Sequence, residues 1–161
     1  MPLWFEKMEI NVSNYQKKIR ISKKWVREAA AEVLKRVGIN GELSMVLVDN
    51  KYIRKLNRKY RHKDRATDVL SFQQNNCMQK RGQATFSKKM NSSFSKIPLL
   101  LGDVVISVER AKSQAEEYGY TFKDEMAMLV EHGILHLLGF THKKMEMVAT
   151  SATCRRGRKR R

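Results

Sequence analysis

The apolar segment LLLGDVVIS, residues 99–107, constrains the fold more than any other part of this sequence. Its run of leucine, valine and isoleucine has the length and composition of a strand buried inside a sheet. Ser107 ends the run and is a good helix N-cap, so we expect a helix to follow directly and to end near Gly119. A buried strand followed at once by a helix favours an architecture in which helices pack on a sheet.

Other segments predict more elements of both kinds. Strands are expected at 7–12, 42–49 and 68–72, and helices at 23–37, 51–60 and 122–138. Ser22 and Thr121 are N-cap candidates, while Gly38 and Gly139 stand where helices would stop. The predicted fold class is therefore α+β, with a small mixed sheet and several helices packed on it.

The 161 residues suggest one domain with a real core. We expect a single catalytic α+β domain over residues 1–142. Inside it, residues 73–97 lack periodicity and are rich in Gln, Asn, Ser and Lys, which predicts a mobile loop. Residues 143–161 end in RRGRKRR and predict a basic, disordered tail.

Positive charge dominates the sequence but is unevenly distributed. The formal net charge is +17, and residues 1–72 carry 17 basic against 8 acidic side chains. Residues 98–142 instead carry 3 basic and 7 acidic side chains. A basic body around an acidic region favours a polyanionic partner together with a bound cation. The apolar runs are too short to span a bilayer and no signal peptide is evident, so we expect a cytoplasmic protein without a membrane partner.

Three of the four histidines lie in the segment EHGILHLLGFTH, residues 131–142. His132 and His136 are four residues apart, which places both imidazoles on one face of the predicted helix. Gly139 can end that helix and let the chain reverse, so that His142 returns as a third ligand. Three imidazoles predict a metal site on the helix and the following turn. Zinc suits them best, with a fourth position open for water or substrate.

The same spacing occurs in the metzincin proteases, whose motif is HExxHxxGxxH. Their general base is the glutamate after the first histidine, and here that position is Gly133. Glu131 points about a hundred degrees away on a helix and is a poor substitute. A metzincin-like metalloprotease is therefore the less favoured interpretation.

A second notable segment, residues 53–72, is rich in arginine and lysine with interleaved aromatic side chains. Arginine offers phosphate a planar, two-pronged donor set, and aromatic rings offer stacking faces to unpaired bases. Arg61 stands just past the predicted helix end, in a loop of the kind that delivers residues to sites. The predicted RNA-binding residues are Arg58, Lys59, Arg61, Lys63 and Arg65.

These motifs together resemble the YbeY family of metal-dependent endoribonucleases, which act in ribosomal RNA maturation. The matching segments are LNRKYRHKDRATDVLSF (56–72), LGDVVIS (101–107) and HGILHLLGFTH (132–142). The resemblance implies one zinc ion per chain, held by His132, His136 and His142. It also implies that Arg61 is the functional arginine of a YRxxD segment and that Asp103, in the GD strand, is a catalytic candidate.

Two functions from different classes follow. The first is a zinc-dependent, single-strand-specific endoribonuclease that acts on ribosomal RNA, whose general base is either metal-bound hydroxide or Asp103. The second is a ribosome- or RNA-binding assembly factor with a structural metal. Small ribosomal subunit proteins or an assembly GTPase are the candidate protein partners in either case.

Overall fold

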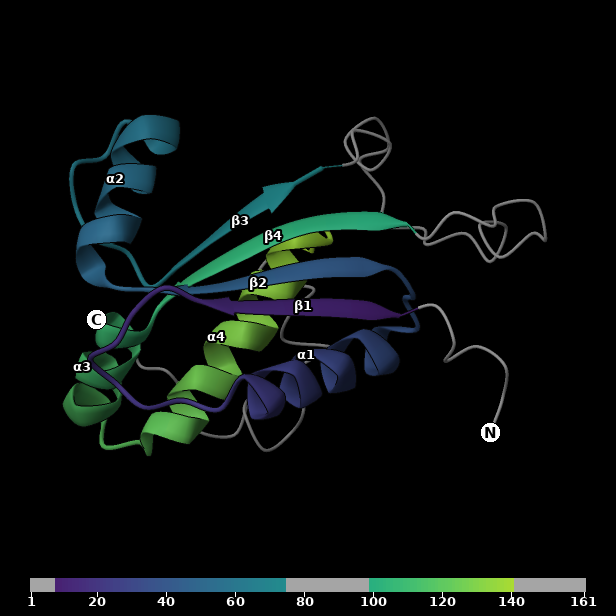
Figure 1. Ribbon diagram of the computed structural model, residues 1–161, viewed down its shortest axis with the longest axis horizontal. Coiled ribbons are helices and arrows are strands. Elements are labelled where there is room, and N and C mark those ends of the chain that lie inside the picture. Colours follow the sequence, from purple (N-terminus) through teal and green to yellow (C-terminus); the bar gives the residue numbers. More distant parts are fainter. Residues whose placement is uncertain (1–7, 75–98, 141–161) are drawn as a thin grey trace.

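The computed structural model describes residues 8–74 and 99–140. One sheet contains four strands in the order β1-β2-β4-β3, and helices pack on both of its faces (Figure 1). The elements in chain order are β1 (Glu9–Asn14), α1 (Lys23–Val37), β2 (Glu42–Val48), α2 (Asn50–Arg61), β3 (Val69–Gln73), β4 (Leu100–Ser107), α3 (Val108–Tyr118) and α4 (Phe122–Leu137).

The sheet is mixed, as predicted. Strands β1, β2 and β4 run parallel, and β3 pairs antiparallel with β4 at one edge. The central strand β4 is the segment from which the fold was predicted, and it is buried along nearly its whole length. The α+β fold class is therefore confirmed.

Local capping chemistry sets the helix boundaries. Ser22 and Ser107 accept hydrogen bonds from the backbone N–H groups of Trp25 and Arg110 and so begin α1 and α3. Gly38 and Gly119 end these helices in the left-handed conformation, at φ 69° and 70°. The predicted helix at 51–60 is one residue longer at each end.

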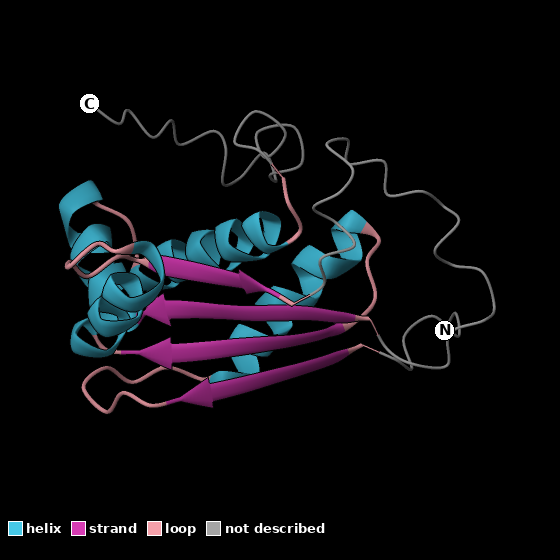
Figure 2. Ribbon diagram, turned by 90° about the horizontal axis from the view of Figure 1, so that it is seen from above, coloured by secondary structure: helices cyan, strands magenta, loops and turns pink. Residues whose placement is uncertain are grey.

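The core has two parts, one on each face of the sheet. Helices α1 and α4 pack on one face with Leu43, Met45, Val104 and Ile106 among many others. Helix α2 packs on the other face, where Ile53 meets a smaller cluster of Val48, Leu70 and Val105. Seen from above, α1 runs obliquely behind the strands and α4 lies toward the β3 edge (Figure 2). The two faces therefore carry different helices and different parts of the predicted site.

The predicted loop and the predicted tail lie mostly outside the described residues. Strand β3 includes Gln73, the first residue of the segment predicted to be a loop. Residues 75–98 and the predicted tail at 143–161 lie outside the described residues. Within the described ranges, no helix is long and apolar enough to cross a membrane.

Candidate functional site

His132 and His136 lie together on the last turns of α4. Their Nε2 atoms are 2.9 Å apart and their ring centroids 4.3 Å apart, with the ring planes nearly perpendicular. His132 is half-buried and His136 is exposed, so the pair opens toward solvent. The predicted juxtaposition of these two imidazoles is present in the structure.

The donor geometry of this pair fits a zinc ion with little movement. Zinc held at about 2.0–2.1 Å by each of two nitrogens, in tetrahedral geometry, keeps those nitrogens about 3.3 Å apart. The observed separation of 2.9 Å needs to open by only a few tenths of an ångström. Side-chain torsions of His132 and His136 can supply that change without moving the helix.

The third predicted ligand, His142, lies outside the described residues. Among residues 8–74 and 99–140 no group of three His, Cys, Asp or Glu side chains converges on one point. The described part of the site therefore consists of two imidazoles at the end of α4.

Close packing at position 133 explains why glycine, and not a glutamate, follows the first histidine. A Cβ atom at this position would lie 2.5 Å from Val104 Cγ1 and 3.0 Å from Val69 Cγ2. The hydroxyl of Ser71 also donates a hydrogen bond of 2.8 Å to the Gly133 carbonyl oxygen. Position 133 therefore faces the sheet at close approach, and a glutamate side chain has no room there.

Glu131 is engaged away from the histidines. It is 7% exposed, and its Oε1 accepts a hydrogen bond of 2.9 Å from Arg36 Nη1 on α1. This ion pair joins α4 to α1 on the core side of the helix. The structure supports the sequence argument that Glu131 does not replace the missing metzincin glutamate.

Arg61 is the last residue of α2, and not a residue of the following loop as predicted, and it is exposed. Helix α2 packs on the face of the sheet opposite α4, so the structure does not bring Arg61 into contact with the histidine pair. Arg61 makes no ion pair with any residue in the described part of the chain. Its guanidinium is therefore available to an external anion.

The other predicted RNA-binding residues surround the end of α2. Lys59 Nζ lies 5.1 Å from the centroid of the Tyr60 ring, which in turn meets Phe72 edge-on at 5.0 Å. His62 ends the helix in the left-handed conformation at φ 56° and turns the chain toward β3. These predicted residues are all exposed, and they are Arg58, Lys59, Arg61, Lys63 and Arg65.

Asp103 lies on the same face of the sheet as α2. Side chains alternate along β4, and its neighbour Val104 faces Gly133 on α4. Asp103 pairs in register with Phe72, which packs on the α2 side, and its Oδ2 accepts a hydrogen bond of 2.9 Å from Gln74 Nε2. Asp103 therefore shares a face with Arg61, and the histidines lie on the other.

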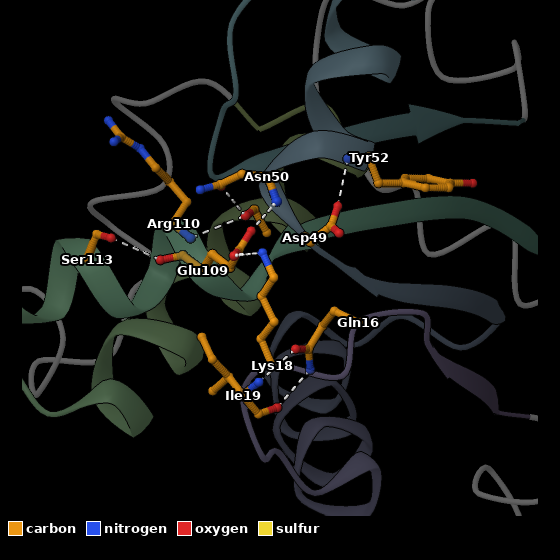
Figure 3. Close-up of polar contacts among 10 residues, drawn as sticks. Gln16, Lys18, Ile19, Asp49, Asn50, Tyr52, Glu109, Arg110 and Ser113 are labelled. Atoms are coloured by element: carbon orange, nitrogen blue, oxygen red, sulfur yellow. Dashed lines mark hydrogen bonds and ion pairs between the residues drawn. The ribbon is translucent and has the colours of Figure 1, made fainter.

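Sequence reasoning missed two polar residues that position α2. The buried Asn57 donates through Nδ2 to the Arg65 carbonyl oxygen at 2.8 Å, which holds the loop after the helix. Glu109 accepts from the backbone N–H of Asn50 and from Lys18 Nζ, each at 2.7 Å, which holds the helix start (Figure 3). These two hydrogen bonds lower the pKa of Glu109, that from Asn50 most strongly. The sequence does carry a signal for Asn57, because it lies four residues after Ile53 and so falls on the buried stripe of α2.

An imidazole pair on one face of a sheet and a strongly basic helix on the other suit a nuclease, a hydrolase of phosphodiester bonds. Comparisons with known proteins agree with that class. The family model described as Endoribonuclease YbeY matches residues 11–152. The chain belongs to the YbeY endoribonuclease family. It is accordingly an enzyme that cleaves RNA.

Individual relatives support the assignment. A Syntrophomonas wolfei protein named Endoribonuclease YbeY is 39% identical over 145 residues, which cover 86% of this chain and 87% of the relative. One of the same name from Bacillus mycoides is 44% identical over 119 residues, or 74% and 70% of the two chains. The solution structure of TM1509 from Thermotoga maritima aligns with a TM-score of 0.53 at 25% identity, covering 86% of this chain and 83% of that one.

Proposed function

We propose that this chain is a zinc-dependent, single-strand-specific endoribonuclease that acts in ribosomal RNA maturation. The observation that carries the proposal is the His132–His136 pair, whose Nε2 atoms are 2.9 Å apart at the exposed end of α4. His132, His136 and His142 would hold one zinc ion per chain. When bound, zinc would polarise a phosphoryl oxygen and make water more acidic.

The substrate in this proposal contacts both faces of the sheet. Strand β3 is an edge strand, with α2 on one side of it and the histidine end of α4 on the other. An RNA strand held on α2 would cross this edge to reach the histidines. An unpaired strand can make that bend, whereas a duplex is too stiff and too wide, which supports single-strand specificity.

The chain's own residues would divide the work between binding and charge stabilisation. Arg58, Lys59, Lys63 and Arg65 would neutralise RNA phosphates around the end of α2. Arg61 would stabilise the negative charge that develops on the reacting phosphate. Asp103 would accept a proton if the RNA brings the reacting group to its face of the sheet.

The test of the metal site uses histidine variants. His132→Ala and His136→Ala should each lose nearly all bound zinc and RNA cleavage, because two imidazoles alone hold zinc weakly. His62→Ala removes the only histidine outside the proposed site and should keep about one zinc per chain. Elemental analysis of the purified proteins and cleavage of an unstructured RNA give the two readouts. Parental zinc content in His136→Ala would refute the site.

Partners beyond RNA are part of the same proposal. Ribosomal RNA as substrate would bring the protein to small ribosomal subunit proteins or to an assembly GTPase. The basic surface of α2 suits such RNA-rich surroundings. Co-sedimentation of the His136→Ala variant with small ribosomal subunits tests this association without cleavage.

A further inference from the structure

Two tyrosines form an exposed stacked pair where the parallel strands end. Tyr15 follows β1 and Tyr52 lies in the first turn of α2, and their side chains are 68% and 46% exposed. The ring centroids are 6.4 Å apart and the ring planes differ by 15°. Most large apolar side chains in the described residues are buried, so an aligned pair of exposed rings is unusual on this surface.

The backbone around each tyrosine is tied down. Tyr15 donates its N–H to the Leu47 carbonyl oxygen at 2.9 Å, and the following turn is braced by the buried Gln16, which bonds both backbone groups of Ile19. Tyr52 donates its N–H to Asp49 Oδ1 at 2.7 Å. Because both attachment points are held, binding a ligand against the rings costs little conformational entropy.

Three exposed lysines stand close to the two tyrosines along the chain. Lys17, Lys51 and Lys55 are exposed and make no ion pair within the described ranges. The nearby carboxylates are occupied, since Asp49 caps α2 and Glu109 accepts from Lys18 and the backbone of Asn50 (Figure 3). Flat rings among free cations match a ligand that is both flat and anionic, namely an unpaired nucleotide.

We propose that Tyr15 and Tyr52 form a stacking site for an unpaired RNA base. The inference rests on the proposed function, because the base belongs to the same strand that α2 would hold through its phosphates. Lys55 and Lys59 follow Tyr52 by three and seven residues, which places them on one stripe of the helix. This stripe leads from the tyrosine pair toward Arg61.

The helix sets the distance between the two ends of this surface. Tyr52 and Arg61 are nine residues apart on α2, which corresponds to about 14 Å at 1.5 Å per residue. A stacked strand advances about 3.4 Å per nucleotide, so about four nucleotides span the interval. A dinucleotide cannot occupy both ends, whereas a decamer can.

The test measures RNA affinity with EDTA present to prevent cleavage. Tyr15→Leu/Tyr52→Leu keeps apolar bulk and charge but removes both aromatic faces. The double variant should bind an unstructured RNA decamer about tenfold more weakly than the parent, with an unchanged slope against salt. Fluorescence anisotropy of labelled RNA gives the affinities, and thermal unfolding confirms that each variant folds.

Two further variants sharpen the result. Tyr118→Leu is the matched control, because Tyr118 is 48% exposed beside Tyr120 but follows Glu116 and Glu117 in an acidic setting. It should bind RNA like the parent. Tyr52→Trp keeps an aromatic face at this position, so it should bind RNA with parental affinity, and RNA should quench its added indole emission.

The outcomes separate the inference from the proposed function. Parental decamer affinity in the double leucine variant, alongside weakened binding in Arg58→Ala/Lys59→Ala, overturns the stacking site and leaves the proposed function standing. An equal loss in Tyr118→Leu also overturns it. A parent protein that neither binds nor cleaves unstructured RNA refutes the proposed function itself.

Discussion

At the scale of single residues, Arg61 illustrates how a side chain can be available to an anion without lying near the proposed metal ligands. It ends α2, is exposed, and has no ion-pair partner in the described part of the chain. The proposed role therefore requires the reacting phosphate to lie at the β3 edge, between the end of α2 and the histidine end of α4. Arg54 on the same helix is different, because it is committed to Asp64 through two hydrogen bonds of 2.9 and 3.0 Å.

Arg61→Lys should separate binding from catalysis. Lysine keeps the charge but loses the planar fork that can hold two phosphate oxygens. We expect near-parental RNA affinity and a loss of about a hundredfold or more in the cleavage rate at saturating RNA. Single-turnover kinetics give the rate, and Lys59→Ala, which should weaken affinity modestly without slowing the chemical step, is the control. A parental rate in Arg61→Lys would make Arg61 an ordinary surface cation.

Asp68 should make stability depend on acidic pH. Burial raises its pKa, but hydrogen bonds from Gln114, the Val69 backbone and Thr67 outweigh burial, so the pKa is lowered in the folded protein. A carboxyl with a lowered folded pKa contributes stability above its unfolded pKa, near 3.9, and loses it as pH falls through the folded value.

The test compares Asp68→Asn with the parent. The difference in free energy of unfolding should be constant from pH 7 to about pH 5 and shrink below about pH 4. Denaturant titrations at several pH values measure it. Glu28→Gln, at an exposed carboxylate of α1, is the control. A difference that stays constant down to pH 2 would assign the effect to lost packing and not to charge.

At the scale of elements, the close approach of α4 to the sheet is the feature that orients the histidines. Gly133 lets the helix backbone lie against Val104 and Val69, and the bond from Ser71 holds it there. Because His132 adjoins Gly133, the contact that seats the glycine also determines which way the imidazole points.

Gly133→Ala should destabilise the protein by about 1–3 kcal/mol, because the new methyl group overlaps Val104 Cγ1 in a packed core. The helix propensity of alanine offsets this only in part. Val104→Ala in the same chain removes the nearest clash and should restore part of the loss. Urea unfolding of the two single variants and the double variant forms a thermodynamic cycle. Additive effects would mean that the two side chains do not meet.

At the scale of the whole molecule, charge is divided between a basic body and an acidic segment. Residues 143–161 contribute eight basic side chains and one acidic side chain to the net positive charge of the chain. A strand of RNA held by such a surface releases counterions when it binds. Electrostatics should therefore dominate RNA affinity, while the proposed zinc ligands and Arg61 should govern the rate of cleavage.

RNA affinity should fall steeply with salt, and removing residues 155–161 should flatten that dependence. The deletion takes away six basic side chains and none of the proposed catalytic residues, so cleavage at saturating RNA should persist. Binding measured between about 50 and 200 mM salt gives the two slopes. A scrambled tail of the same composition is the control and should behave like the parent. An affinity that is independent of salt would contradict an electrostatic role for this charge.

The sequence by itself determined the elements and the imidazole pair, because these depend on local chemistry. Ser22, Ser107 and Thr121 cap the helices that they were predicted to cap, and a spacing of four residues necessarily places His132 beside His136 on a helix. The family motifs also lie in local segments, which is why a resemblance could be seen before any fold was known.

Only the tertiary structure decided how these parts face one another. The pairing of β3 with β4 sends Asp103 to the α2 face and leaves the histidines on the other, and no local pattern specifies that arrangement. Likewise, Tyr15 and Tyr52 are 37 residues apart and stack only because β1 pairs with β2, the strand before α2. Long-range register and packing bring such residues together, and these depend on the whole core.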